Sequence, residues 1–125
     1  MQTTRPVAFV ASTDLGRSRA FYVDLLGLEP VGLDEFALEV RSGSVPVRIT
    51  HVPDHVALPF TVLGWEVDDI ACEVADLRAQ GVATTRYPWF EQDDDGVWIA
   101  PGGTRVAWFT DPDGNVLSFA QPVTA

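Results

Sequence analysis

The sequence predicts an α+β fold that is built from two βαβββ repeats. One order of signals occurs twice along the 125 residues: a short apolar run, an aspartate that can cap a helix, a helical apolar pattern and a glycine. The spacing of these signals agrees, because 55 residues separate Asp14 from Asp69 and 54 separate Gly27 from Gly81. Strand-like segments follow each helix. An ordered set of matches at one spacing indicates an internal repeat.

The first repeat opens with a strand and an amphipathic helix. Residues 7–11 form a short apolar run, as expected of a buried strand. Asp14 is a favourable N-cap, and apolar side chains recur at helical spacing until Gly27 ends the helix. Two strand-like segments, 36–40 and 45–52, flank a Ser-Gly-Ser turn. The helical apolar face consists of Phe21, Tyr22, Leu25 and Leu26.

The second repeat has the same order. A strand is expected over 60–67, and a helix between Asp69 and Gly81 with Ile70, Val74 and Leu77 on its apolar face. Segments 105–110 and 116–120 flank the sequence DPDGN, whose residues favour a tight turn between paired strands. Each half therefore reads strand, helix and three strands, with the helix covering one face of its sheet.

The second repeat contains a long extra stretch. Gly27 and Arg48 are 21 residues apart, whereas Gly81 and Ser118, the corresponding pair by strand order, are 37 apart. The 16 surplus residues fall in the stretch 86–103, which combines aromatic and acidic side chains. Long loops of this kind often carry function. Two interpretations stay open: a mobile flap that closes over a cavity, or a surface loop whose aromatics complete the core while its acids are solvated. These residues are Tyr87, Trp89, Phe90, Glu91, Asp93, Asp94, Asp95 and Trp98.

Composition excludes several classes of function. Eighteen acids face eight arginines and no lysine, and the net charge of −10 would repel nucleic acid. No apolar stretch approaches the ~20 residues of a membrane helix. The single cysteine, Cys72, permits no internal disulfide, and we expect it to be a packed, inert thiol. We therefore predict a cytoplasmic protein with one domain over 1–125 and repeats at about 6–52 and 60–121.

These motifs together resemble the vicinal oxygen chelate superfamily, the group of glyoxalase I, extradiol dioxygenases, fosfomycin-modifying enzymes and bleomycin-resistance proteins. The resemblance covers about residues 6–121 and rests on the helical segment 19–28, the segment 67–82 and the sequence WFTDPDGN at 108–115. It implies sheets that curl around a shared cavity, usually within a homodimer. It also implies four inward side chains, typically His, Gln or Glu, that hold a divalent metal.

The four positions that match the family's metal ligands do not carry such side chains. They are Val7, Arg48, Val62 and Ser118, and they offer neither carboxylate nor imidazole. We therefore predict no metal and no cofactor. The two histidines, His51 and His55, flank Pro53 in a post-strand loop and are expected to be a surface pair.

Strand alternation on the family's geometry predicts a small-molecule pocket. Its residues are Phe9, Arg48, Thr50, Trp98, Trp108, Val116 and Ser118. Arg48 would be a buried cation that needs either an acid from the flap or an anionic group of a ligand. We expect an aromatic ligand body near Trp108, with an anion or carbonyl directed at Arg48 and a cation toward the flap. Trp65 has the opposite parity and should pack beneath a helix.

Three hypotheses for function follow. The leading one is metal-independent binding of a small aromatic or amphipathic organic molecule by a homodimer. The second is an enzyme of the glyoxalase or dioxygenase kind, a lyase or an oxidoreductase, with an unrecognised metal or acid–base site. The third is an interaction or regulatory module without a ligand. No catalytic residue can be assigned from the sequence.

Overall fold

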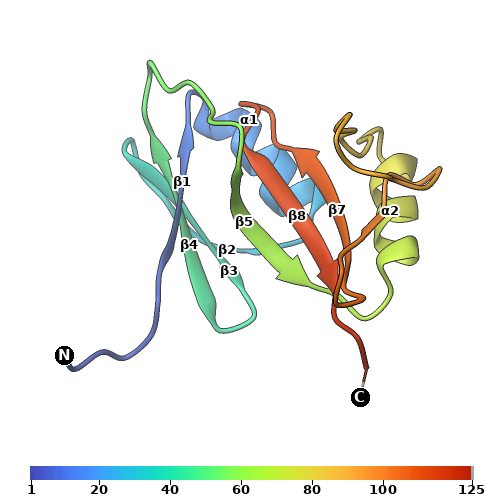
Figure 1. Cartoon of the computed structure of the whole chain (residues 1–125). Helices are drawn as coiled ribbons and strands as arrows, with labels where there is room; N and C mark the ends of the chain where they lie inside the picture. Colours follow the sequence, from blue (N-terminus) through green and yellow to red (C-terminus); the bar gives the residue numbers. More distant parts are fainter. Residues whose placement is uncertain (125) are drawn as a thin grey trace. The chain divides into compact units, whose positions relative to one another are not determined.

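The computed structural model describes residues 1–124, and these residues form two compact units that follow the predicted repeats (Figure 1). Unit 1 contains Met1–Ala57 together with Asp111–Gly114. Unit 2 contains Leu58–Thr110 and the chain from Asn115 onward. The turn Asp111–Gly114 thus belongs to the first unit, although the strands on either side of it belong to the second.

Unit 1 is a four-stranded mixed sheet with one helical segment. In the order β1-β4-β3-β2, β1 and β4 are parallel and the other neighbours are antiparallel. The Asp14 side chain accepts a hydrogen bond from the Arg17 amide at 3.1 Å, and Gly27 has a φ of +79° at the helix end, as predicted. The elements are β1 (Ala8–Ser12), α1 (Leu15–Arg19), η1 (Ala20–Leu25), β2 (Glu29–Leu33), β3 (Ala37–Ser42) and β4 (Val45–His51).

The helical segment of unit 1 widens where its aromatic residues lie. Over η1 the backbone forms a π-helical turn, in which the Leu26 amide donates to the Phe21 carbonyl at 2.9 Å. Phe21 and Tyr22 are both buried, whereas Leu25 and Leu26 are only half-buried. The apolar face of the helix is therefore made by two successive rings. Against them the sheet buries Val10, Leu38, Val40, Val47 and Ile49.

Unit 2 repeats this architecture. Its sheet has the order β5-β8-β7-β6, with β5 and β8 parallel and the other neighbours antiparallel. The Asp69 side chain accepts from the Cys72 amide at 3.1 Å, and Gly81 ends the helix with a φ of +86°. The elements are β5 (Thr61–Glu66), α2 (Ile70–Ala79), β6 (Trp98–Ile99), β7 (Arg105–Thr110) and β8 (Val116–Gln121).

The predicted fold class is confirmed: residues 1–124 form two four-stranded mixed sheets in βαβββ order, and neither is a closed barrel. The core of unit 2 joins Ile70, Val74 and Leu77 to Phe109 and Leu117. No helix among residues 1–124 is long and apolar enough to cross a membrane.

One expectation on the helix of unit 2 was wrong. Cys72 lies exposed on α2 rather than packed. The reason is its position on the helix. Ile70, Val74 and Leu77 form the buried stripe, and Cys72 lies on the other side of the helix.

Candidate functional site

One face of the sheet in unit 2 gathers the predicted tryptophans and Ser118. Trp108 on β7 pairs with Ser118 on β8, and Ser118 pairs with Gly64 on β5, so the three residues form one row across the sheet. Trp98 pairs with Val106, which has the same parity as Trp108. The opposite face carries the buried Phe109 and Leu117 and is covered by α2.

Trp65 lies on the helix side of this sheet, as its parity predicts. It is in register with Phe119, and the two ring centroids are 6.2 Å apart. Phe119 is buried in the core of the unit. Trp65 is half-buried and packs beside the core, and the aromatic face opposite the helix is formed by other rings.

Aromatic side chains of the long stretch pack around Trp108: Phe90 contacts both Trp98 and Trp108, Tyr87 contacts Trp108, and Trp89 contacts Tyr87 and Phe90. We call these five rings the aromatic cluster: Tyr87, Trp89, Phe90, Trp98 and Trp108. Phe90 stacks on Trp108 with a centroid distance of 5.0 Å and an interplanar angle of 8°, and its centroid lies 4.4 Å from that of Trp98. Tyr87 meets Trp108 edge-on at 5.3 Å. Trp89, which contacts Tyr87 and Phe90, remains 72% exposed.

Hydrogen bonds from Gln92 hold the base of this loop. The Gln92 Oε1 accepts from the Tyr87 amide at 2.8 Å, and Nε2 donates to the carbonyls of Thr85 and Gly96 at 3.0 and 2.8 Å. The Thr85 amide in turn donates to the Trp108 carbonyl at 2.7 Å. The loop is therefore attached to the sheet of its own unit.

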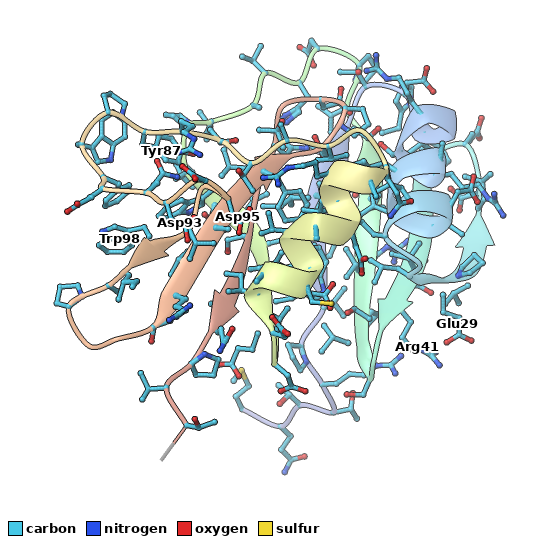
Figure 2. All side chains as sticks on the ribbon, turned by 90° about the vertical axis from the view of Figure 1, so that its right-hand side faces the viewer. Glu29, Arg41, Tyr87, Asp93, Asp95 and Trp98 are labelled. Carbon is cyan, nitrogen blue, oxygen red and sulfur yellow. The ribbon has the colours of Figure 1, made fainter. Side chains whose placement is uncertain are left out.

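The residues Asp93, Asp94 and Asp95 each take part in a contact that holds the loop. Asp93 Oδ1 accepts from the amides of Asp95 and Val97, both at 2.9 Å. Asp95 pairs with Arg78 of α2 at 3.2 Å. Arg86 donates to the Asp94 carbonyl at 2.8 Å. Figure 2 shows Asp93 and Asp95 near Tyr87 and Trp98 in unit 2.

The predicted pocket residues of unit 1 lie on the sheet face that the helix does not cover. Phe9 on β1 pairs with Arg48 on β4, which pairs with Glu39 on β3, and Ala11 pairs with Thr50. Phe9 is 63% exposed, and other large apolar side chains in this unit are exposed as well. They include Val7, Val31, Leu33 and Phe36.

The expectation that Arg48 is buried was wrong, because its side chain is exposed. The charge of Arg48 acts on Asp34. The pKa of Asp34 is lowered chiefly because its carboxylate accepts hydrogen bonds from the Phe36 and Ala37 amides, at 2.8 and 2.9 Å, and also because Arg48 is near. An exposed guanidinium needs neither a flap acid nor a ligand anion to compensate for desolvation.

The predicted pocket thus draws on both units. Phe9, Arg48 and Thr50 belong to unit 1, and the other predicted residues, Trp98, Trp108, Val116 and Ser118, belong to unit 2. One face of the sheet in unit 2 carries Trp98, Trp108 and Ser118. Val116 lies on the same face, in register with Thr61 and Thr110, but it is only 6% exposed.

The residues at the family's metal positions do not fit a metal ion. Val7 precedes β1, Val62 lies where the β5–β8 register shifts, and neither has a ligating atom. The other two are the exposed Arg48 and the half-buried Ser118. Among residues 1–124, no three His, Cys, Asp or Glu side chains are grouped so that they could hold a metal.

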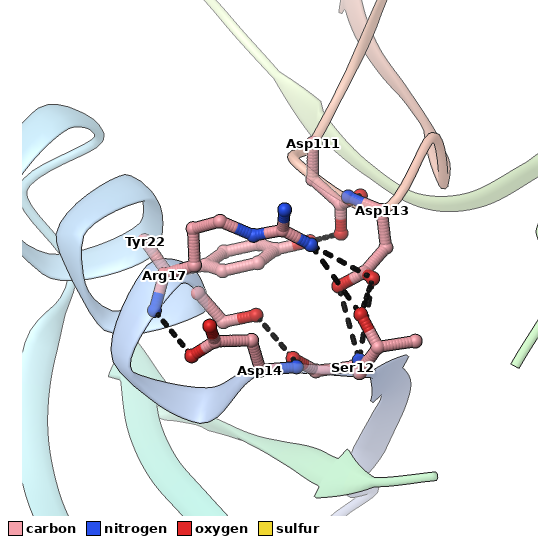
Figure 3. Close-up of polar contacts among 8 residues, drawn as sticks. Ser12, Asp14, Arg17, Tyr22, Asp111 and Asp113 are labelled. Atoms are coloured by element: carbon pink, nitrogen blue, oxygen red, sulfur yellow. Dashed lines mark hydrogen bonds and ion pairs between the residues drawn. The ribbon is translucent and has the colours of Figure 1, made fainter. Parts of the chain in front are cut away.

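A polar network that sequence reasoning missed joins the DPDG turn to the helix of unit 1 (Figure 3). The Tyr22 hydroxyl donates to Asp111 Oδ2 at 2.6 Å, and both residues are buried. Asp113 accepts from the Thr13 amide at 3.2 Å and from its hydroxyl, and it pairs with Arg17 at 3.4 Å. The DPDGN sequence indicated a turn, but nothing local indicated its partners.

This network is suited to a structural role. Burial, followed by the charge and hydrogen bond of Asp111, raises the pKa of Tyr22 well above its usual range near 10. Its hydroxyl therefore stays protonated and acts as a hydrogen-bond donor. A general acid or base needs access to a substrate and a pKa near the working pH. Tyr22 has neither, since its side chain is 0% exposed.

Two four-stranded sheets, each formed by a βαβββ repeat whose first and last strands are parallel neighbours, define the class of this protein as a paired-repeat α+β protein. The family model described as the Glyoxalase/Bleomycin resistance protein/Dioxygenase superfamily matches residues 5–119. The chain belongs to this superfamily. A comparison with curated protein sequences finds no match.

Solved structures share the fold over nearly the whole chain. A bleomycin resistance determinant encoded on the transposon Tn5 is 21% identical with a TM-score of 0.74, and the match covers 98% of this chain and 100% of that one. A bleomycin-binding protein complexed with bleomycin is 22% identical, with a TM-score of 0.75 and coverages of 97% and 100%. TnmS3, an antibiotic binding protein from Streptomyces sp. CB03234, is 23% identical, with a TM-score of 0.71 and coverages of 98% and 99%.

Proposed function

We propose that this chain binds a small aromatic or amphipathic organic molecule without a metal. The observation that carries the proposal is the aromatic cluster on the sheet face of unit 2 opposite α2, combined with non-ligating side chains at the four metal positions. Ligand sites are mostly apolar and aromatic, with a few polar anchors. Ser118, in register with Trp108, offers such an anchor.

The relatives support this choice of ligand class. One structural neighbour is complexed with bleomycin, and another is described as an antibiotic binding protein. The proposed pocket residues are Phe9, Arg48, Thr50, Trp98, Trp108, Val116 and Ser118. The proposal includes a homodimer and a cytoplasmic location, which the family resemblance and the cysteine content support.

The ligand class can be tested with three planar probes of similar size and different charge. These are naphthalene-2-sulfonate, 2-naphthol and N-methylquinolinium. Isothermal titration calorimetry should detect saturable binding of at least one of them, and Trp108→Leu should weaken that binding about tenfold, because one ring contact contributes about 0.5–1.5 kcal/mol beyond the buried area. The matched control is Trp65→Leu, which removes a tryptophan from the opposite face of the same sheet. Absence of binding, or equal binding by the wild type and Trp108→Leu, would refute the proposal.

The metal is tested separately. Elemental analysis of the purified protein should find well below one divalent ion per chain, and EDTA should leave the calorimetric titration unchanged. A stoichiometric ion that disappears in Ser118→Ala would instead support the enzyme hypothesis.

A further inference from the structure

We propose that Phe90 controls access to the ring faces of Trp98 and Trp108, because its own ring occupies the place where a planar ligand would stack. This inference rests on the proposed function and adds to it the residue that sets ligand selectivity. A ligand would bind by displacing the Phe90 ring, so the cost of displacement would favour molecules with a larger or more polarisable planar surface.

The ring geometry is the first support for this inference. The Phe90 ring lies nearly parallel to Trp108, at 8° and 5.0 Å, and its centroid is 4.4 Å from that of Trp98. Aromatic rings that stack in proteins have centroids about 4.5–7 Å apart. The centroids of Trp98 and Trp108 are 6.0 Å apart, with their planes at 29°. The Phe90 ring thus stacks on Trp108 and packs against Trp98 at a tilt of 37°, in the place where a bound planar molecule would contact the same two rings.

The backbone around Phe90 is the second support. Phe90 lies in the segment 88–91, between Tyr87 and Gln92, which are held together through the Gln92 side chain. Within the segment the Phe90 amide donates to the Tyr87 carbonyl at 3.1 Å. Pro88, Trp89 and Glu91 are all exposed. The tip of the loop is held mainly by the ring contacts of Trp89 and Phe90, so it can move when these contacts are replaced while its base stays attached to the sheet.

The sheet surface in line with Trp108 is the third support. The next residues in its row are Ser118 and Gly64, which have a short side chain and none. A Cβ placed at Gly64 would lie 2.5 Å from Ser118 Oγ, so this part of the row cannot carry a larger side chain without rearrangement. A ligand on Trp108 would therefore meet no bulky side chain along the row.

Occupation by Phe90 has a measurable consequence. The apparent dissociation constant rises by the factor by which the open state is depopulated. The open state lacks the two contacts of Phe90 with Trp98 and Trp108, so it should be depopulated about 5-fold to 150-fold. Removing the Phe90 ring should therefore tighten binding by this factor, whereas removing a ring that merely lines a pocket would weaken it.

The experiment measures the affinity of naphthalene-2-sulfonate, 2-naphthol and N-methylquinolinium by isothermal titration calorimetry. Phe90→Leu and Phe90→Ala should bind the best probe about 5-fold to 150-fold more tightly than the wild type. The matched control is Phe36→Leu, the same change at an exposed phenylalanine of unit 1, and it should leave the affinity unchanged. Circular dichroism verifies that the variants fold.

A second measurement uses the wild type alone. Hydrogen exchange of the Phe90 amide should become faster when the best probe is saturating, because displacement breaks its bond to the Tyr87 carbonyl. Unchanged or weaker binding by the Phe90 variants, or slower exchange at Phe90, would overturn this inference and leave the proposed function intact. If neither the wild type nor the variants bind any probe, both proposals fail. Binding by the variants alone would show that Phe90 blocks the ring faces of Trp98 and Trp108, and it would refute ligand binding by the wild type.

Discussion

Replacing Tyr22 with phenylalanine removes the hydroxyl that donates to the buried carboxylate of the DPDG turn. That hydroxyl lies 2.6 Å from Asp111 Oδ2, and the two residues are 0% and 5% exposed. The ring itself keeps its edge-on contact with Phe21 at 5.1 Å. The loss is thus confined to one hydrogen bond to a charged group, which contributes about 1.5–3 kcal/mol to the free energy of unfolding. With an unfolding entropy of about 0.26 kcal/mol/K for a chain of this length, Tm should fall by about 6–11 °C.

The effect should also depend on pH. The pKa of Tyr22 is raised in the folded protein, mainly by burial and then by the charge and hydrogen bond of Asp111. Above pH ~10 the unfolded chain releases the tyrosine proton while the folded protein retains it, so stability falls by about 1.4 kcal/mol per pH unit from this group. This contribution is complete below pH ~10 and decreases above it. Tyr22→Phe lacks the contribution, so the stability gap between the two proteins should narrow at alkaline pH.

Urea unfolding followed by circular dichroism at pH 7, 9.5, 10.5 and 11 measures both effects. The matched control is Tyr87→Phe, at the other tyrosine of the chain. Tyr87 is half-buried, and its substitution should change the free energy of unfolding by less than about 0.5 kcal/mol. Equal stability of Tyr22→Phe and the wild type at pH 7, or a gap that stays constant up to pH 11, would refute this reasoning.

Two further substitutions test the local geometry. Asp34→Ala should destabilise the protein at pH 7, because the lowered pKa of Asp34 marks a carboxylate that is stabilised in the folded state. This contribution is present above pH ~4 and is lost as pH falls through the lowered pKa. In urea unfolding at decreasing pH, the stabilities of Asp34→Ala and the wild type should therefore converge, and a constant difference would contradict the assignment. Gly64→Ala should cost about 1–3 kcal/mol, because the new Cβ would lie 2.5 Å from Ser118 Oγ. Adding Ser118→Ala should recover part of that loss in a double-mutant cycle, and strictly additive losses would show that the contact is not its cause.

The parts of the fold that sequence could predict are those whose signals are local. Asp14 and Asp69 cap their helices through hydrogen bonds to an amide three residues ahead, and Gly27 and Gly81 adopt positive φ at the helix ends. Such features depend on a few neighbouring residues. Strand alternation likewise grouped Val116 with Ser118, because side-chain direction along a strand has a period of two, and the family resemblance placed Trp98 and Trp108 on the same face.

The partners of the DPDG turn could not be predicted in the same way. Tyr22 and Asp111 are 89 positions apart, and neither residue carries a local sign of the other. A buried tyrosine at helical spacing reads as core, and an aspartate before proline reads as turn. Both interpretations are correct, but the hydrogen bond between the two side chains can be seen only in the tertiary structure.

Phe90 and Arg48 show a second limit of reasoning by parity. Alternation states on which face a side chain lies, but whether that face is covered depends on what packs over it. Arg48 has the predicted parity, in register with Phe9, yet its side chain is exposed because no element of unit 1 covers this face. Trp108 also has the predicted parity, and there a loop does cover the face, with the Phe90 ring on the tryptophan. The surface at Trp108 that was predicted to contact a ligand is thus already occupied by the Phe90 ring. Substitution of Phe90 therefore tests most directly whether this cluster is a packed core or a ligand-binding site.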